Sequence, residues 1–179
     1  MRKTHSTAGS TFQSPNGGPL GYVVEGQPRL VNALPHQPVV PNPVDGRPKR
    51  VALITVCLGD DGVLLDGLAD RVDGVVVAGF GVGHVPQHLV GKLQELAEQV
   101  PVVLASRTGA GPVLADTYGF TGSERDLLAR GLIRAGFLDP LKSRILLSAV
   151  LATGADRKAV TAAWPWTLAT TVRDGAAGA

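Results

Sequence analysis

The sequence predicts an α/β fold built on a small parallel sheet, and two features carry this prediction. Three uninterrupted apolar runs of strand length, at residues 51–58, 74–78 and 101–105, are typical of strands buried on both faces. Segments with helical spacing of apolar residues separate these runs, and such alternation favours right-handed crossovers with helices on both faces of the sheet. We therefore expect a three-layer, Rossmann-like α/β domain at residues 51–165.

Residues 1–50 differ in character from the rest of the chain. Two strand-like segments around Glu25 predict a β-hairpin at residues 22–31. Residues 34–50 are rich in proline and are expected to form an extended linker. Since a lone hairpin is unstable in water, this one must extend a sheet that lies elsewhere or pack on the following domain.

Five helices are expected, at residues 61–72, 86–99, 123–130, 139–152 and 156–163. Pro86 suits the first turn of the second helix. Asp139 is a good N-cap, and Pro140 follows it at the first helical position. Residues 166–179 end in small residues, and we expect this tail to fray.

The composition excludes several classes of function. The net charge is only +2 and 4% of residues are aromatic, without a basic stripe, so no nucleic-acid partner is expected. No apolar stretch is long enough to cross a bilayer, and no signal sequence follows Met1. We expect no membrane association and a cytoplasmic location, and leave open a leader on a longer parent protein. The single cysteine, Cys57, lies in an apolar run and is expected to be a small buried hydrophobe.

A glycine-rich turn, G-F-G-V-G-H at residues 79–84, is the strongest local motif. Such a turn lets the backbone approach a ligand closely, and the helix that follows offers free N–H groups. The third glycine comes one residue too early for a dinucleotide-binding motif, and no acidic residue ends the next strand. We predict no cofactor. The alternative to a ligand-binding turn, a tight strand-to-helix turn without a ligand, stays open.

The polar residues near the strand ends have ordinary explanations when each is taken alone. His84 suits a solvent-facing position before a helix, and Glu124 suits a charge that favours a helix N-terminus. The loop at residues 106–111 is either a ligand loop or a turn held by Arg107. No metal site is predicted, and no hydrolytic triad can be assembled, because no serine lies in a G-x-S-x-G motif.

Several short segments together resemble the bacterial L-asparaginase and glutaminase family of amidohydrolases. They include F-Q-S-P-N-G-G-P-L-G-Y-V, S-R-T-G and L-D-P-L-K-S-R-I-L-L, and the full set lies at residues 3–7, 12–23, 78–86, 106–109, 118–120, 131–133 and 138–147. These segments follow the order of the family and extend over nearly all of residues 2–163. Their combination makes the resemblance specific.

The resemblance implies that the chain is a C-terminal portion of such an enzyme, with residues 1–33 as a remnant of the N-terminal domain. The hydroxyl groups that the family uses for attack would lie upstream of Met1. Lys3 matches the family's catalytic lysine, and Glu124 matches the carboxylate that binds the substrate ammonium across a subunit boundary. His84 occupies a position where many members have an asparagine that also reaches across.

The resemblance further implies a reaction and partners. The expected reaction converts L-asparagine and water into L-aspartate and ammonia, with L-glutamine as an open alternative substrate. A homo-oligomer with active sites between subunits is expected for the full-length form, and the chain alone is expected to be inactive. The alternative is a non-catalytic domain for small-molecule binding or dimerisation.

Overall fold

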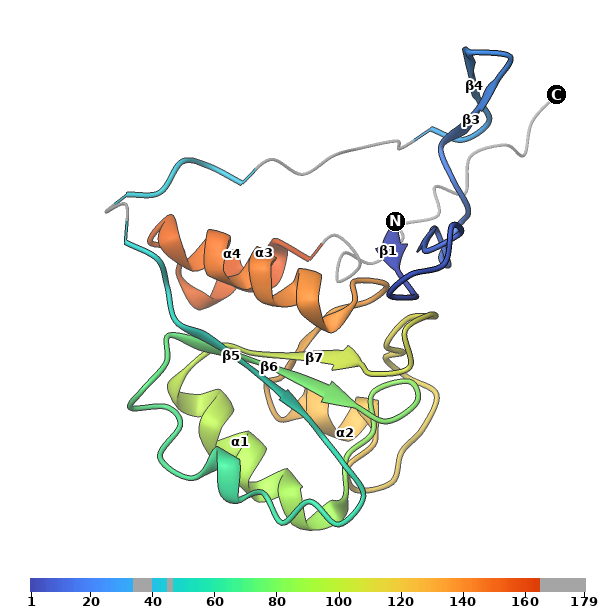
Figure 1. Ribbon diagram of the computed structural model, residues 1–179. Coiled ribbons are helices and arrows are strands. Elements are labelled where there is room, and N and C mark those ends of the chain that lie inside the picture. Colours follow the sequence, from blue (N-terminus) through green and yellow to red (C-terminus); the bar gives the residue numbers. More distant parts are fainter. Residues whose placement is uncertain (34–39, 45–46, 165–179) are drawn as a thin grey trace, which may run out of the picture.

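The computed structural model describes residues 1–33, 40–44 and 47–164 (Figure 1). Four parallel strands form the main sheet in the order β5-β6-β7-β8. Their bounds are β5 Val51–Thr55, β6 Gly74–Gly79, β7 Val102–Ser106 and β8 Ile133–Arg134. This sheet confirms the predicted α/β class, and the strand order follows the sequence, as expected for successive right-handed crossovers.

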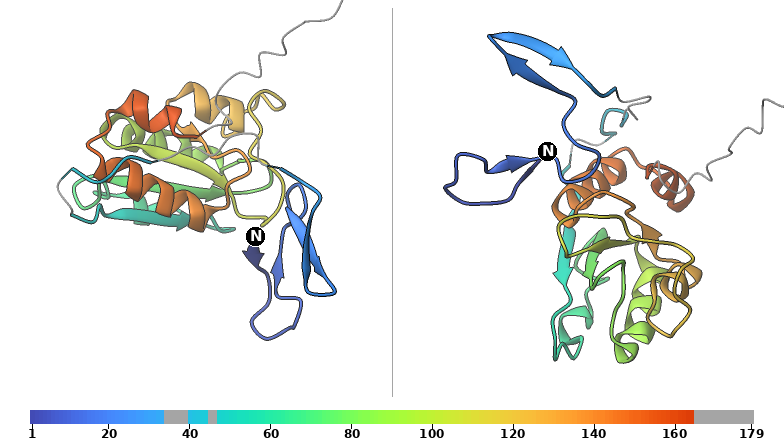
Figure 2. Two further views of the ribbon diagram at one scale, coloured as in Figure 1. Left: turned by 90° about the horizontal axis from the view of Figure 1, so that it is seen from above. Right: turned by 90° about the vertical axis from the view of Figure 1, so that its right-hand side faces the viewer.

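Helices cover both faces of the sheet (Figures 1 and 2). The helices on one face are α1, Val90–Gln99, and α2, Glu124–Ala129, and those on the other are α3, Pro140–Ala152, and α4, Arg157–Ala162. Side chains of β6 alternate between the layers: Val75 and Val77 pack in the core with α1, whereas Val76 packs in the core with α3. A strand with a core on each side must be apolar at every position, which explains the unbroken apolar runs.

The prediction of a helix at residues 61–72 is wrong. Only a single 3₁₀ turn forms there, η1, Val63–Leu65. The apolar spacing is sufficient for a helix, but Gly62 and Gly67 adopt positive φ angles of 76° and 61°. Left-handed backbone at these two positions interrupts a right-handed helix.

The first strand is shorter than expected and the interpretation of Cys57 is wrong. β5 ends at Thr55, whereas the apolar run continues to Leu58. Leu58 is 89% exposed and Cys57 is exposed. Once the chain leaves the sheet it loses its two covering layers, and apolar composition alone does not show where this happens.

The remaining helices form close to their expected positions, and three of them have a side-chain cap. The N-caps of α2, α3 and α4 are Ser123, Asp139 and Asp156, and each accepts a hydrogen bond from a backbone N–H in the first turn. The second expected helix begins with a 3₁₀ turn, η2, Gln87–Leu89, and continues as α1. Among the helices of the described residues, none is long and apolar enough to cross a membrane. The expected fraying at 166–179 lies outside the described residues.

Two small antiparallel pairs precede the main sheet. Strand β1, Arg2–Lys3, pairs with β2, Phe12–Gln13, and was not expected from the sequence. The expected hairpin is present as β3, Gly21–Val24, and β4, Gln27–Leu30. It forms a sheet of its own and projects away from the helices and the main sheet (Figure 2).

The β3–β4 hairpin should show little protection against hydrogen exchange. Its side chains are mostly exposed, and within the described residues neither edge pairs with a third strand. By contrast, β6 lies between two strands and is fully buried, so its amides should exchange far more slowly. Exchange of the 179-residue chain, followed by mass spectrometry of its peptides, measures both. Equal protection of the two segments would show that the hairpin is packed in solution.

Candidate functional site

The glycine-rich turn after β6 folds back on itself and fixes the position of His84 at its end. Backbone N–H groups of Phe80 and His84 each donate to the carbonyl of the other, at 2.8 Å, and Gly83 N–H donates to Phe80 O. A Cβ atom at Gly79 would lie 2.7 Å from His84 O, so a side chain there would open the turn. Since these amides are bonded within the turn, they do not form a free anion cradle. The motif therefore forms a tight strand-to-helix turn.

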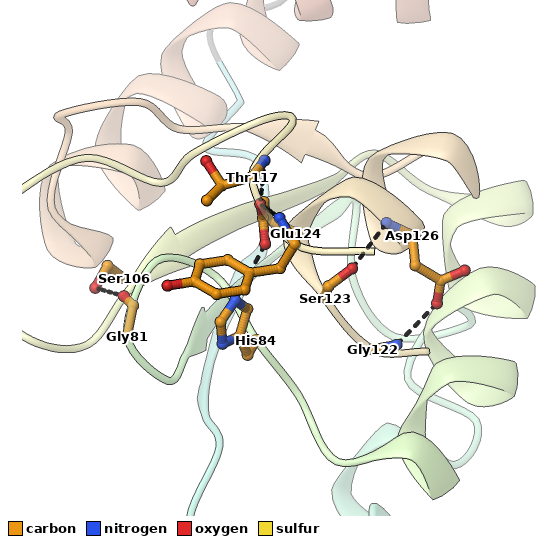
Figure 3. A network of polar contacts seen from close by, with 9 residues as sticks. Gly81, His84, Ser106, Thr117, Gly122, Ser123, Glu124 and Asp126 are labelled. Carbon is orange, nitrogen blue, oxygen red and sulfur yellow. Dashed lines mark hydrogen bonds and ion pairs between the residues drawn. The ribbon is translucent and has the colours of Figure 1, made fainter. Parts of the chain in front are cut away.

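Glu124, the first residue of α2, faces His84 across the site (Figure 3). One carboxylate oxygen of Glu124, Oε2, lies 3.0 Å from His84 Nε2. The other, Oε1, accepts hydrogen bonds from the backbone N–H groups of Thr117 and Tyr118, at 3.0 and 2.8 Å. The Glu124 side chain is fully buried, so these bonds tie the incoming loop to the start of the helix.

The surroundings of Glu124 keep it ionised. Burial of the carboxyl raises its pKa, but hydrogen bonds from the backbone N–H groups of Tyr118, Glu124 itself and Thr117, and from the His84 side chain, outweigh burial and hold the pKa below its ordinary value. Protonation of the carboxylate would break some of the hydrogen bonds that these donors make to it. The ionised form is therefore the more stable one. The site therefore carries a fixed, buried negative charge.

Two aromatic rings surround His84. The ring centroids of Tyr118 and Phe120 each lie 4.9 Å from the imidazole, in edge-to-face arrangements. Tyr118 and Phe120 themselves remain about half exposed, whereas His84 is 23% exposed. Packing of this kind restricts rotation of the imidazole and leaves one part of it open to solvent.

Glu124 lies in the first turn of α2, as its interpretation as a charge at a helix N-terminus predicted, but it is fully buried. His84 is only 23% exposed, so its interpretation as a solvent-facing residue is wrong. The two residues lie 40 positions apart in the sequence but form one hydrogen-bonded pair. Sequence reasoning also missed the backbone of Thr117 and the rings of Tyr118 and Phe120 as parts of the site. Backbone donors have no sequence signature, but the aromatic pair just before the Ser123 cap was visible as a cluster.

Lys3 lies in a different place. It lines a cavity of about 410 Å³ over the ends of β5 and β6, together with Thr55, Arg107 and Lys142. Neither His84 nor Glu124 lines this cavity. The structure therefore brings His84 and Glu124 together but does not bring Lys3 to them within one chain.

Other polar residues near the strand ends have structural roles. Arg107 Nη1 donates to Val56 O at 2.8 Å, and the guanidinium lies 4.0 Å from the centre of the Phe80 ring. This arrangement fits the turn held by Arg107 that the sequence left open. Asp60 and Asp61 accept from backbone N–H groups two residues ahead, as turn-capping carboxylates do. In the part of the chain that the structure describes, no group of three or more His, Cys, Asp or Glu residues could hold a metal ion.

Comparison with known proteins identifies relatives that share this domain. Residues 50–163 match the family described as the glutaminase/asparaginase C-terminal domain. A probable L-asparaginase of Deinococcus radiodurans is 39% identical over 110 residues, covering 62% of this chain and 33% of that protein. One of the glutamyl-tRNA(Gln) amidotransferase subunits of Aeropyrum pernix is 34% identical over 158 residues, covering 85% of this chain and 36% of that protein.

A solved structure gives the same result for the fold. The crystal structure of a probable cytoplasmic L-asparaginase from Campylobacter jejuni superposes with a TM-score of 0.75 at 31% identity, covering 91% of this chain and 50% of that one. The chain thus spans between a third and a half of the length of these relatives. With 114 of its 179 residues matched by the family model, the chain belongs to the glutaminase/asparaginase family, whose C-terminal domain it contains.

Proposed function

We propose that this chain supplies the C-terminal part of an L-asparaginase-type amidohydrolase, which converts L-asparagine and water into L-aspartate and ammonia. The observation that carries the proposal is the buried, ionised Glu124 paired with the partly exposed His84, within a domain of this family. A fixed negative charge behind a hydrogen-bonding ring suits recognition of a small cationic group such as the substrate ammonium. L-Glutamine is the alternative substrate.

In this proposal, catalysis and substrate binding are divided between an N-terminal part and the C-terminal domain. The groups that attack the amide would lie in the portion of the relatives that this chain does not cover, and the C-terminal domain would bind the substrate. In this division, residues 1–33 belong with the N-terminal domain, residues 34–50 link the two parts, and residues 51–165 form the C-terminal domain. A cytoplasmic location is supported by the naming of the Campylobacter jejuni relative.

The separation of Lys3 from His84 and Glu124 supports an oligomer with shared active sites. If Lys3 and the His84–Glu124 pair are both parts of the active site, one chain would supply Lys3 to one site and the His84–Glu124 pair to a neighbouring site. Oligomers of this kind are commonly symmetric, so every site would be complete. Ammonia release by the chain mixed with a separately made N-terminal half of a relative tests the proposed function.

Lys3→Met should lower turnover strongly in such a mixture, by about 100-fold or more. Loss of the cation would remove a group that assists proton transfer at the attacking hydroxyl, while the apolar stem of the side chain would be kept. Steady-state kinetics of ammonia release measures the effect, and Lys142→Met provides the matched control, because Lys142 lines the same cavity but is bonded to Asp139 and Met1. Equal turnover in the wild-type and Lys3→Met mixtures would remove Lys3 from the proposal.

A second candidate is the corresponding domain of an amidotransferase. The 34% identity to the Aeropyrum pernix amidotransferase protein, over 85% of this chain, favours it. The two candidates differ in substrate requirement, because an asparaginase releases ammonia from the free amino acid without an acceptor. Steady ammonia release from L-asparagine alone would favour the asparaginase, and release only with L-glutamine and an acceptor would favour the amidotransferase.

A further inference from the structure

We propose that Asn16 is a positioning residue for Lys3, because its side-chain amide fastens the strand pair that carries Lys3 to the C-terminal domain. This inference rests on the proposed function, in which Lys3 assists proton transfer. It gives a role to two segments that the His84–Glu124 pair does not involve, F-Q-S-P-N-G-G-P-L-G-Y-V and the loop that begins with S-R-T-G.

The two ends of the Asn16 side-chain amide bond to separate loops of the C-terminal domain. Its oxygen, Oδ1, accepts a hydrogen bond from the backbone N–H of Gly111 at 2.9 Å. Its nitrogen, Nδ2, donates to the backbone carbonyl of Phe137 at 3.3 Å. These partners lie 95 and 121 positions away in the sequence. Asparagine offers an acceptor and a donor on one short side chain, so it can link both loops to the N-terminal segment at once.

The position of Lys3 follows from the position of Asn16. Lys3 in β1 pairs with Phe12 in β2, so the two strands form one ribbon. β2 ends at Gln13, and Asn16 follows three residues later. Between them, Pro15 restricts the backbone and stiffens this short connection. A fixed Asn16 therefore fixes β2, and β2 fixes the backbone of Lys3.

Apolar packing does not hold the β1–β2 pair in place. Phe12 is 61% exposed, and neither core cluster of the described residues includes a residue of the segment 1–33. A two-stranded pair of this size is not stable by itself in water. Lys142 Nζ donates to Met1 O at 2.7 Å, but the Lys142 side chain is 45% exposed, and a hydrogen bond from an exposed, flexible side chain adds little. The pair therefore depends on Asn16 for its place on the domain.

The loop that bonds Asn16 also leaves room for β1. Gly109 adopts a φ angle of 93°, and a Cβ atom there would collide with the guanidinium of Arg2, the residue before Lys3. Arg2 thus lies directly against the loop, two residues before the Gly111 N–H that bonds to Asn16. The loop contacts the ribbon on the side of β1 and bonds the chain just after β2.

Limited proteolysis of the 179-residue chain tests the anchor without any need for activity. Trypsin cleaves after Lys3 only when β1 has separated from β2, because a protease binds an unpaired, extended segment. Asn16→Ala should raise the rate of this cleavage about tenfold, since two hydrogen bonds are lost. Asn32→Ala is the matched control, because Asn32 Nδ2 donates to Pro19 O at 2.8 Å, within the N-terminal segment. Equal rates in wild type and Asn16→Ala would overturn the inference.

Kinetics of the chain mixed with an N-terminal half of a relative tests the positioning role. Asn16→Ala should lower kcat about tenfold and leave KM within about twofold, because a misplaced Lys3 slows proton transfer while the substrate contacts stay intact. Asn32→Ala should change neither constant. In the Lys3→Met background, Asn16→Ala should cause no further loss of kcat, since both changes act through the same ammonium group. A second tenfold loss in that background, or a rise in KM at constant kcat, would show that Asn16 does not act through Lys3.

The failure of this inference is distinguishable from failure of the proposed function. Ammonia release by the wild-type mixture, together with an unchanged kcat in Asn16→Ala, would overturn the role of Asn16 alone. Absence of ammonia release from the wild-type mixture would overturn the proposed function and, with it, the catalytic purpose of the anchor. The rates of tryptic cleavage would still decide whether Asn16 holds the strand pair.

Discussion

The 179-residue chain alone should release no measurable ammonia from L-asparagine. Amide hydrolysis needs an activated nucleophile and donors placed for the developing oxyanion. The candidate site offers a buried carboxylate and an imidazole, with no hydroxyl bonded to either among the described residues. Lys3 lies at another cavity, and no member of the His84–Glu124 pair lines that cavity. Loss of positional order alone costs several orders of magnitude in rate.

An N-terminal half of an asparaginase relative, made separately and mixed with the chain, should restore ammonia release. A coupled assay for ammonia measures the chain, the half and the mixture side by side. The half alone provides the control, because the proposal requires both parts. Steady turnover by the chain alone, abolished by a substitution within it, would show that the chemistry resides in these 179 residues.

Replacement of Glu124 by alanine should lower the free energy of unfolding by about 2–4 kcal/mol. The variant would leave two backbone donors, those of Thr117 and Tyr118, without the acceptor that they share, in a place where the side chain is fully buried. His84 would also lose the bond that fixes its ring. Chemical denaturation measures the change, and Ser123→Ala serves as a control that removes only the cap of the same helix, at a cost of about 1 kcal/mol. A loss no larger than that of the control would show that the loop is held by other contacts.

The Glu124 carboxyl should make the stability of the chain depend on pH, with a loss of stability on acidification. The pKa of Glu124 is lower in the folded chain than its ordinary value, which applies to the unfolded chain. Its stabilising contribution is therefore fully present above the unfolded pKa and is lost as the pH falls through the lowered, folded pKa. The difference in unfolding free energy between wild type and Glu124→Gln should shrink on acidification over this range. A difference that grows on acidification would contradict the direction of the pKa shift.

Prediction from the sequence succeeded where one kind of interaction decides the structure. The strands at Gly74–Gly79 and Val102–Ser106 are buried on both faces, so their apolar runs are nearly sufficient to identify them. The helix Pro140–Ala152 begins at the expected cap. The helix expected at residues 61–72 does not form, because its apolar spacing is helical but two of its glycines adopt left-handed backbone.

The sequence by itself determined the α/β class, most of the helices and strands, and the family, because burial, capping and motif order are properties of neighbouring residues. Only the tertiary structure decided that His84 and Glu124 form one pair, since the turn after β6 and the start of α2 meet through folding. It also decided that Glu124 is buried and ionised, because its charge is stabilised by the backbone of Thr117 and Tyr118, and the position of a backbone N–H group depends on the path of the whole chain. The separation of Lys3 from this pair has the same origin, because the distance between two side chains is set by how the segments that carry them pack.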